Sequence, residues 1–217
     1  MADMASKTVL ITGANSGIGK VAARELARMG ATVVIVCRDK VKAEAALREV
    51  RPLSGNGHVE WILADLSSQA AIRALTRDFM AKYTRLDVLL NNAGLYAPRR
   101  VLTVDGIETT FAVNHLAYFL LTHLLLGVLK QSVPSRIINV ASGAHQGGRI
   151  EFDNLQEERR YSGVMAYSNS KLIILATQAH AHVRQFAAQR GNLCGKRAGL
   201  LWQQAVSRKN LGLAIAA

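Results

Sequence analysis

The chain contains 217 residues, of which 50% are hydrophobic and 19% charged, and its formal net charge is +12. This length and composition can bury one ordinary hydrophobic core, so we expect a single domain over residues 1–217. Two distant cysteines, Cys37 and Cys194, exclude a disulfide framework and a cysteine-based metal site. Residues 1–7 lack the apolar core of a secretion signal, so we expect a cytoplasmic protein.

A glycine-rich turn separates the first predicted strand from the first predicted helix. Residues 8–12 are aliphatic and β-branched, and residues 20–29 repeat apolar side chains at helical spacing. Between them, Gly13 permits a tight turn, Gly17 lets the backbone approach a phosphate, and Gly19 allows close helix packing. Free N–H groups and the positive dipole end at the helix start would bind a pyrophosphate. The pattern predicts a dinucleotide site that includes Gly13, Asn15, Ser16, Gly17, Ile18 and Gly19.

The second predicted strand, residues 32–37, ends where such folds discriminate between NAD and NADP. An acidic residue there accepts hydrogen bonds from the adenosine ribose and favours NAD, whereas an arginine accommodates the 2′-phosphate of NADP. Cys37 occupies the acidic position and Arg38 follows it, although Asp39 is close enough to compete. The charge argument favours NADP over NAD.

Further strands are predicted at residues 59–64, 86–91 and 136–141, with helices between them. This alternation predicts an α/β protein with a doubly wound parallel sheet of the Rossmann type. Ligands bind such sheets at the carboxyl ends of the strands, where the sequence places Gly13, Arg38, Asp65, Asn91 and Ser142. A second interpretation makes Asp65 a helix N-cap, because two serines and an apolar helix over residues 70–79 follow it.

Tyr167 and Lys171 are four residues apart, which places them on one face of a predicted helix. A free tyrosine ionises at a pH of about 10, too high for a base at neutral pH, and a neighbouring ammonium stabilises the phenolate. Such a pair suits acid/base catalysis, which works best when the pKa lies near the operating pH. On its own the pair also fits an exposed helix face, so its catalytic interpretation depends on the rest of the sequence.

The glycine spacing, the Asn91-Asn92-Ala93-Gly94 segment and the Tyr167/Lys171 pair together resemble the short-chain dehydrogenase/reductase family, in its compact single-domain branch. The resemblance covers about residues 7–175. It is closest to retinol-dehydrogenase-like and related bacterial reductases, judged from Cys37-Arg38-Asp39, Asn114-His115-Leu116 and Ser142-Gly143-Ala144-His145. It implies an NAD(P)-dependent oxidoreductase that transfers a hydride between a nicotinamide and the carbonyl or alcohol of a small molecule.

The resemblance also implies a role for each matching residue. Tyr167 matches the general acid/base, Lys171 its partner and a ligand of the nicotinamide ribose, and Ser142 the hydroxyl that holds the substrate oxygen. Asn114 matches a residue that keeps a helix kinked around a water and links the lysine to solvent. Asp65 matches an acid that contacts the adenine. The cofactor-binding residues implied in this way are Arg38, Asp65, Leu66, Asn91, Ala93, Gly94, Tyr167 and Lys171.

Three histidines and one apolar stretch invite other interpretations. His115, His123 and His145 match no metal-ligand spacing, so no metal is expected. Residues 116–129 are too short for a membrane span, which needs about 20 residues, so we expect a core helix or an oligomer face. In relatives this helix and the one bearing Tyr167 commonly pack across a dimer interface, so the resemblance implies a homo-oligomer.

The C-terminal part departs from the family pattern. Residues 172–217 contain six Lys or Arg and no Asp or Glu. Helical spacing continues to residue 186, but residues 190–217 show neither the expected strand nor a substrate lid. We therefore expect a truncated or frame-altered C-terminus, an atypical basic tail, and an unpaired sheet edge beside the fifth strand. The charges lack interleaved aromatic residues, so no specific nucleic-acid partner is expected.

Two functional hypotheses follow. The first is an oxidoreductase that uses NADP, or NAD, on a small carbonyl or alcohol. The second is a catalytically impaired member of the same family that binds dinucleotide or only pairs with relatives. Both predict an intact glycine turn, and they differ in whether hydride transfer occurs.

Overall fold

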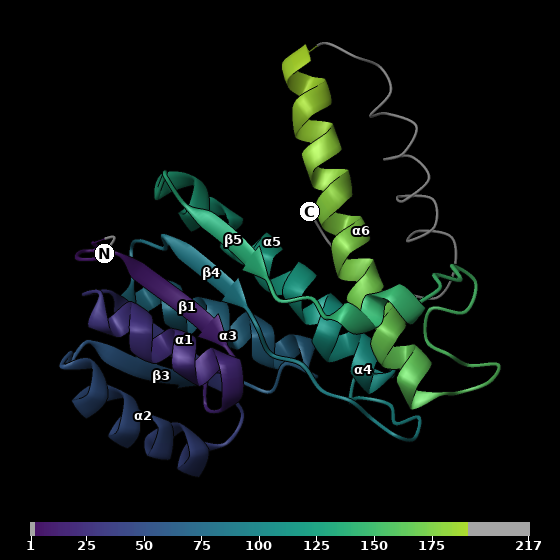
Figure 1. The fold of residues 1–217 in the computed structure, drawn as a ribbon, viewed down its shortest axis with the longest axis horizontal. Helices are drawn as coiled ribbons and strands as arrows, with labels where there is room; N and C mark the ends of the chain where they lie inside the picture. The colour runs from purple at the N-terminus through teal and green to yellow at the C-terminus, as the bar shows by residue number, and fades with distance from the viewer. Residues whose placement is uncertain (1–2, 191–217) are drawn as a thin grey trace.

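The structure is a computed structural model that describes residues 3–190, with side chains described up to residue 177. A parallel sheet of five strands, in the order β3-β2-β1-β4-β5, forms its centre (Figure 1). The strands are β1 Thr8–Thr12, β2 Thr32–Cys37, β3 Val59–Leu63, β4 Val88–Asn91 and β5 Arg136–Asn139. The predicted doubly wound parallel sheet is confirmed, and each strand boundary lies within two residues of its predicted position. The predicted basic tail lies outside the described residues, except for residue 190.

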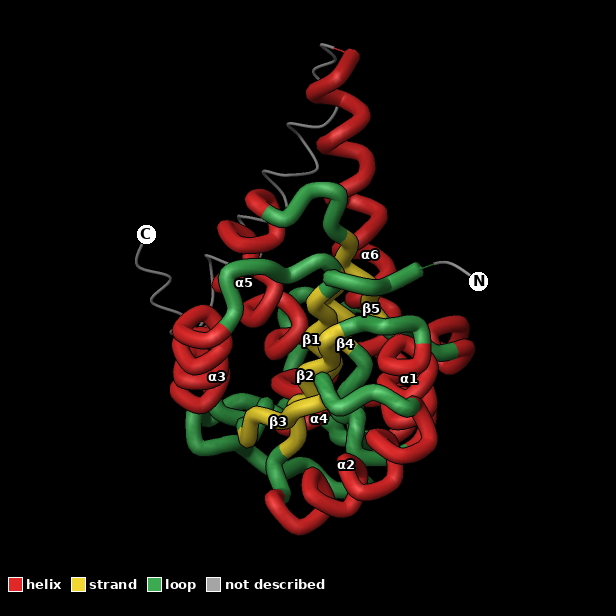
Figure 2. Tube along the Cα trace, turned by 90° about the vertical axis from the view of Figure 1, so that its left-hand side faces the viewer, coloured by secondary structure: helices red, strands yellow, loops and turns green. Residues whose placement is uncertain are grey.

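Helices cover both faces of the sheet, with α1 and α2 on one side and α3 and α5 on the other (Figure 2). The helices are α1 Gly17–Arg28, α2 Lys40–Ser54, α3 Gln69–Lys82, α4 Thr109–Phe111, α5 Ala117–Gln131 and α6 Gly163–Arg190. Two short segments complete the set, a π-helical turn at Ala112–Leu116 and a 3-10 turn at Gly143–Gly147.

The two-residue period of the strands sorts their side chains between these two layers. In β1, Val9 and Ile11 pack with Ala23 and Leu47 of the α1 and α2 layer. Leu10, between them, packs with residues of α3 and α5 on the other face. Because both faces are covered, the central strands are apolar at nearly every position, as expected for a parallel sheet.

The long apolar helix differs from its predicted form. The sequence suggested an apolar helix over residues 116–129, but α4, the π-helical turn and α5 form one longer helical run, Thr109–Gln131, of 23 residues. By length and composition this run could cross a membrane, so the prediction that it is too short is wrong. A core helix passes the same test, and 61% of the most apolar window is buried inside the protein.

At the edge of the sheet, β5 has no neighbouring strand on its outer side among the described residues. Ile137 and Ile138 point to opposite faces of the strand and remain 39% and 45% exposed. Within residues 3–190 no strand follows β5, so the expected unpaired edge is present in this part of the chain. The first turns of α6 pack against the π-helical and 3-10 turns, and its later turns project away from the sheet (Figure 1).

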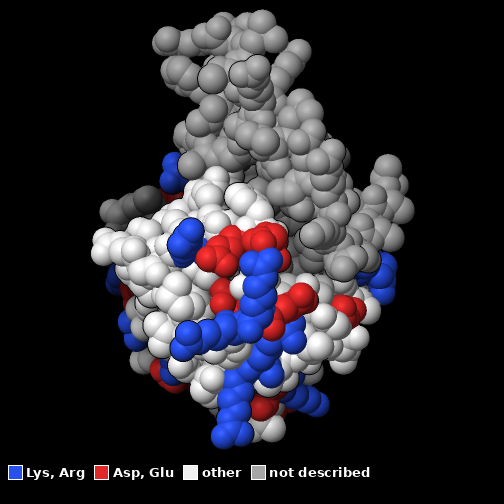
Figure 3. Space-filling view, turned by 90° about the vertical axis from the view of Figure 1, so that its right-hand side faces the viewer, with Lys and Arg blue, Asp and Glu red and all other residues white. Residues whose placement is uncertain are grey.

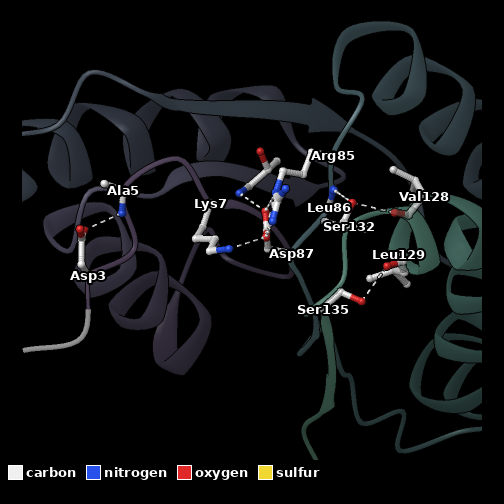
Figure 4. Close-up of polar contacts among 11 residues, drawn as sticks. Asp3, Ala5, Lys7, Arg85, Leu86, Asp87, Val128, Leu129, Ser132 and Ser135 are labelled. Carbon is white, nitrogen blue, oxygen red and sulfur yellow. Dashed lines mark hydrogen bonds and ion pairs between the residues drawn. The ribbon is translucent and has the colours of Figure 1, made fainter.

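A buried carboxylate joins β1 to the start of β4, at the end of the sheet opposite the candidate site. Asp87 is 2% exposed and accepts hydrogen bonds from Lys7 Nζ, the Thr8 N–H and the Arg85 guanidinium (Figure 4). Burial raises the pKa of this carboxyl, but the hydrogen bonds from Arg85, Thr8 and Lys7 outweigh it and lower the pKa to about 2.

We expect Asp87 to stabilise the fold in a pH-dependent way. Its pKa in the folded protein lies below its ordinary value of 3.8, so the stabilisation is complete above that pH and lost as the pH falls towards 2. Asp87→Asn should lower the free energy of unfolding at neutral pH by about 2 kcal/mol and flatten its acid dependence. Urea unfolding at several pH values measures both effects.

Asp78, which is exposed on α3, provides the matched control. Asp78→Asn should leave the unfolding free energy within about 0.5 kcal/mol of the original at every pH. An Asp87→Asn protein as stable as the original at neutral pH would contradict the assignment.

Candidate active site

A cleft with a volume of about 830 Å³ opens at the carboxyl ends of β1, β2 and β4. This volume lies within the range of about 300–1,000 Å³ that small-molecule and cofactor sites occupy. Most of the predicted site residues line it, namely Gly13, Asn15, Ser16, Gly17, Ile18, Arg38, Asp65, Leu66, Ala93, Gly94, Ser142, Tyr167 and Lys171. The cleft therefore brings together the glycine turn and the Tyr167/Lys171 pair, which are far apart in sequence. The roles of these residues stay predictions.

The glycine turn has the geometry that a phosphate cradle requires. Gly13 and Gly17 have positive φ angles of 66° and 53°, which favour glycine. A Cβ on Gly13 would lie 2.8 Å from Ala93 Cα, and one on Gly19 would collide with the Asn92 amide. Neither position therefore has room for a side chain. Ser16 is the N-cap of α1 without a side-chain cap hydrogen bond, which leaves N–H groups at the helix start for an anion. This cradle fits a pyrophosphate.

The turn is fastened to the segment after β4 by two residues that the sequence analysis did not assign to the site. Thr12 Oγ1 accepts hydrogen bonds from the N–H groups of Asn92 and Ala93, at 2.9 and 3.0 Å. The Asn92 amide donates in return to the carbonyls of Thr12 and Gly13. The strand period could have identified Asn92, because consecutive side chains at the end of β4 alternate in direction.

Asn91 was predicted to contact the cofactor, and the structure places its side chain elsewhere. It is fully buried and donates hydrogen bonds to Asn139 Oδ1 and Thr122 Oγ1, beside α5. It does not line the cleft, whereas the next residue, Asn92, does. The cleft wall is therefore formed by Asn92 rather than Asn91, and a cofactor contact of Asn91 stays a prediction.

The far end of the cleft, after β2, carries two cations. Arg38 and Lys42 both line the cleft and are exposed. The described ion pairs include neither of them, whereas Asp39 uses its carboxylate to cap α2 by accepting a hydrogen bond from the Lys42 N–H. Sequence reasoning missed Lys42, although its place four residues after Arg38, at the start of α2, could have indicated it.

Asp65 was open to two interpretations, and the structure separates them. The N-cap of α3 is Ser68, whose hydroxyl accepts a hydrogen bond from the Ala71 N–H. Asp65 instead accepts hydrogen bonds from the N–H and hydroxyl of Ser67 and lines the cleft. The interpretation as a helix cap is wrong, and the cleft position agrees with a cofactor contact.

Tyr167, Lys171 and Ser142 meet at the other end of the cleft, where α6 faces the segment after β5. Lys171 Nζ lies 5.8 Å from the centre of the Tyr167 ring, which agrees with the predicted pairing on one helix face. Ser142 is the N-cap of the 3-10 turn, where its hydroxyl accepts a 3.3 Å hydrogen bond from the Ala144 N–H. Tyr96, another residue that the sequence analysis missed, forms an edge contact with the Tyr167 ring.

Lys171 is buried to 3% exposure, and its ammonium donates a 3.0 Å hydrogen bond to the Val140 carbonyl. Burial lowers the pKa of this lysine below its ordinary value, because the charged form loses hydration. No carboxylate within the described part of the chain forms an ion pair with it. The ammonium is therefore held by a backbone dipole and by its aromatic neighbours.

Asn114 lies behind the cleft, in the π-helical turn, and is fully buried. Its side-chain oxygen accepts from the Leu95 N–H, and its amide donates to the Leu95 carbonyl and to Ser170 Oγ. A Cβ on Gly94 would lie 3.4 Å from Lys171 Nζ and 3.5 Å from Asn114 Oδ1, so the two side chains meet at this glycine. Asn114 thus supports the site from inside without lining the cleft.

The histidines and surface charges supply no competing centre in the described residues. Burial lowers the pKa of His115 to about 4, which keeps this histidine neutral at physiological pH. No cluster of three or more His, Cys, Asp or Glu suited to a metal occurs between residues 3 and 177. On the face in Figure 3, basic and acidic side chains intermingle rather than form a patch of one sign.

Comparison with known proteins extends these observations. Human retinol dehydrogenase 11 is 50% identical over 173 residues, which cover 79% of this chain and 54% of that protein. Human retinol dehydrogenase 13 is 47% identical over 175 residues, which cover 80% and 53% of the two chains. The chain therefore spans about half the length of these curated relatives.

Solved structures agree with the fold. An uncharacterized protein from Mycobacterium paratuberculosis superposes with a TM-score of 0.75 at 42% identity, over 87% of this chain and 66% of that one. Pseudomonas aeruginosa RhlG, solved as an NADP complex, superposes with a TM-score of 0.63 at 30% identity, over 86% and 68% of the two chains. Residues 7–174 match the family described as short chain dehydrogenase. The chain belongs to the short-chain dehydrogenase family.

Proposed function

We propose that this chain is an NADP-dependent oxidoreductase that transfers a hydride between the nicotinamide and the carbonyl or alcohol of a small molecule. The observation that supports this most directly is that the glycine turn, Ser142, Tyr167 and Lys171 line one cleft. Family membership and NADP complexes of similar structures agree with it. Retinol dehydrogenases among the relatives suggest an apolar alcohol or aldehyde as the substrate class.

The proposed chemistry divides between cofactor and protein. A bound nicotinamide supplies or accepts the hydride. Reduction of a carbonyl leaves negative charge on its oxygen, and the Tyr167 phenol would give that oxygen a proton while the Ser142 hydroxyl donates a hydrogen bond. The Lys171 ammonium, 5.8 Å from the Tyr167 ring centre, would favour the phenolate that remains and would hold the ribose.

The preference for NADP is proposed from the cations after β2. A 2′-phosphate near Arg38 and Lys42 would meet one guanidinium and one ammonium group. Within the described residues, neither group forms an ion pair with a carboxylate. An unphosphorylated ribose would gain little from them. Asp39, the competing acid, is the N-cap of α2, and its carboxylate already accepts a hydrogen bond from the Lys42 N–H.

The homo-oligomer also remains a proposal, based on the family resemblance. On α5, Phe119 and Leu126 are 40% and 36% exposed, and this face suits a second copy of the chain. Light scattering of the original protein and of Phe119→Arg would test it, because the substitution should lower the molar mass in solution only if α5 forms the interface. Residence in the cytoplasm likewise stays a prediction, which cell fractionation would test.

Tyr167→Phe should abolish turnover without abolishing cofactor binding. Loss of a general acid/base costs about 100-fold or more in kcat, while the ring and its packing remain. Absorbance at the nicotinamide band with a panel of aldehydes and ketones measures turnover, and quenching of intrinsic fluorescence measures the Kd for NADPH. Tyr83→Phe, remote from the cleft and stacked on Phe79, is the control and should keep full activity.

Three results separate the hypotheses. Turnover in the original protein and its loss in Tyr167→Phe support the oxidoreductase. Cofactor binding without turnover in the original protein supports the catalytically impaired relative. Equal turnover in the original protein and Tyr167→Phe would contradict the assigned acid/base.

Replacing both Arg38 and Lys42 with alanine should weaken NADPH binding selectively. Hydrogen bonds between charged groups contribute about 1.5–3 kcal/mol each, so the Kd for NADPH should rise at least about tenfold, and the Kd for NADH should change less than about threefold. Lys40→Ala is the matched control, because Lys40 lies on the same helix and pairs with Glu44. Equal loss of affinity for both cofactors would contradict the proposed preference.

A further inference from the structure

Tyr118 of α5 contacts two parts of the site without lining the cleft. Its ring centre lies 5.7 Å from Lys171 Nζ, and its hydroxyl donates a 2.7 Å hydrogen bond to the Ala93 carbonyl. The side chain is buried to 4% exposure, so both contacts are shielded from water. No motif of the sequence singled out this residue.

The first contact matters because the Lys171 ammonium is buried with few partners. One carbonyl, that of Val140, accepts a hydrogen bond from it, and the rings of Tyr118 and Tyr167 lie at almost equal distances, 5.7 and 5.8 Å. An ammonium over an aromatic face is attracted by the ring quadrupole, and this attraction grows when water is excluded. The Tyr118 ring therefore compensates part of the hydration that the lysine has lost.

The second contact fixes the loop that follows β4. Tyr118 lies one helical turn after Asn114, so both side chains leave the same face of the helical run. Asn114 holds the backbone of Leu95 through two hydrogen bonds, and Tyr118 holds that of Ala93. Residues 93–95, all of which line the cleft, are thereby fastened at both ends to one helix.

We propose that Tyr118 is a positioning residue, whose ring holds the Lys171 ammonium in place and whose hydroxyl holds the cleft wall at Ala93. The proposal rests on the proposed function, in which Lys171 serves the ribose and Tyr167. It assigns to Tyr118 no contact with substrate or cofactor.

The chemistry of the surroundings agrees with this role. Burial raises the pKa of the Tyr118 phenol, and the charge of Tyr167 raises it further, so Tyr118 remains a neutral hydrogen-bond donor. Among the described residues, the titratable side chains whose rings lie beside Lys171 Nζ are Tyr118 from α5 and Tyr167 from α6. The ring contact is therefore a main electrostatic partner of the ammonium within the described residues.

An NMR titration of Lys171 in the cofactor-free protein tests the ring. Protein labelled at the ε-carbon of lysine reports each ammonium, and loss of one signal in Lys171→Arg assigns it. Tyr118→Met keeps an apolar side chain without a ring, so the titration midpoint of Lys171 should fall by about half a pH unit or more. Tyr118→Phe keeps the ring and should restore the midpoint to within about 0.2 pH units.

The same labelled sample contains a matched control. Lys82 Nζ also lies 5.7 Å from a tyrosine ring, that of Tyr83, but this lysine is 58% exposed and pairs with Glu60. Tyr83→Met should leave the Lys171 midpoint unchanged and move that of Lys82 by less than about 0.2 pH units, because water screens the contact. An unchanged Lys171 midpoint in folded Tyr118→Met would overturn the proposal.

Should Tyr118→Met fail to fold, pentafluorophenylalanine at position 118 keeps the ring shape and removes the attraction for a cation. The Lys171 midpoint should then fall below that of Tyr118→Phe, and equal midpoints would overturn the proposal. A merely structural role predicts a lower melting temperature with no change in either titration.

The Kd for NADPH tests the hydroxyl. Tyr118→Phe should bind NADPH about three to ten times more weakly than the original protein, because the Ala93 carbonyl loses its donor. Unchanged affinity would overturn the hydroxyl role. If the original protein binds no dinucleotide, the proposed function fails, while the lysine titration still decides the ring role.

Discussion

The close approach of the β1–α1 turn to the segment after β4 is the constraint on which the rest of the site depends. Thr12 and Asn92 exchange hydrogen bonds across it, and no side chain would fit at Gly13 or Gly19. This contact brings the start of α1 beside the wall formed by residues 93–95. The glycine turn and residues 93–95 can then line one cleft, because the two segments cannot move apart without breaking partly buried hydrogen bonds.

A second set of contacts gives this cleft its chemistry. Asn114 and Tyr118 leave one helical run and fasten the backbone of residues 93–95, and they reach α6 through Ser170 and Lys171. The lysine that the acid/base would need is consequently buried and held by a backbone carbonyl and two aromatic rings, with no carboxylate partner among the described residues. A carboxylate partner would neutralise the ammonium and weaken its effect on a neighbouring phenol.

Local patterns in the sequence were sufficient for the strands, the glycine turn and the Tyr167/Lys171 spacing, because each depends on neighbours along the chain. Contacts between distant segments were not predictable in this way. Asn91 and Asn92 differ only in strand register, Tyr118 acts through a lysine 53 positions later in the chain, and the π-helical turn joins two helical segments into one run. The N-cap of α3 is Ser68 rather than Asp65, and the sequence did not predict this because several residues before that helix could cap it equally well.

The central claim is that one dinucleotide spans the cleft from the glycine turn to Tyr167. A crystal structure of the protein grown with NADP measures this most directly. The account predicts the pyrophosphate against the N–H groups at the start of α1, the 2′-phosphate beside Arg38 and Lys42, and the nicotinamide ribose at Lys171. Density for NADP at another place on the protein, or an empty cleft at saturating NADP, would contradict it.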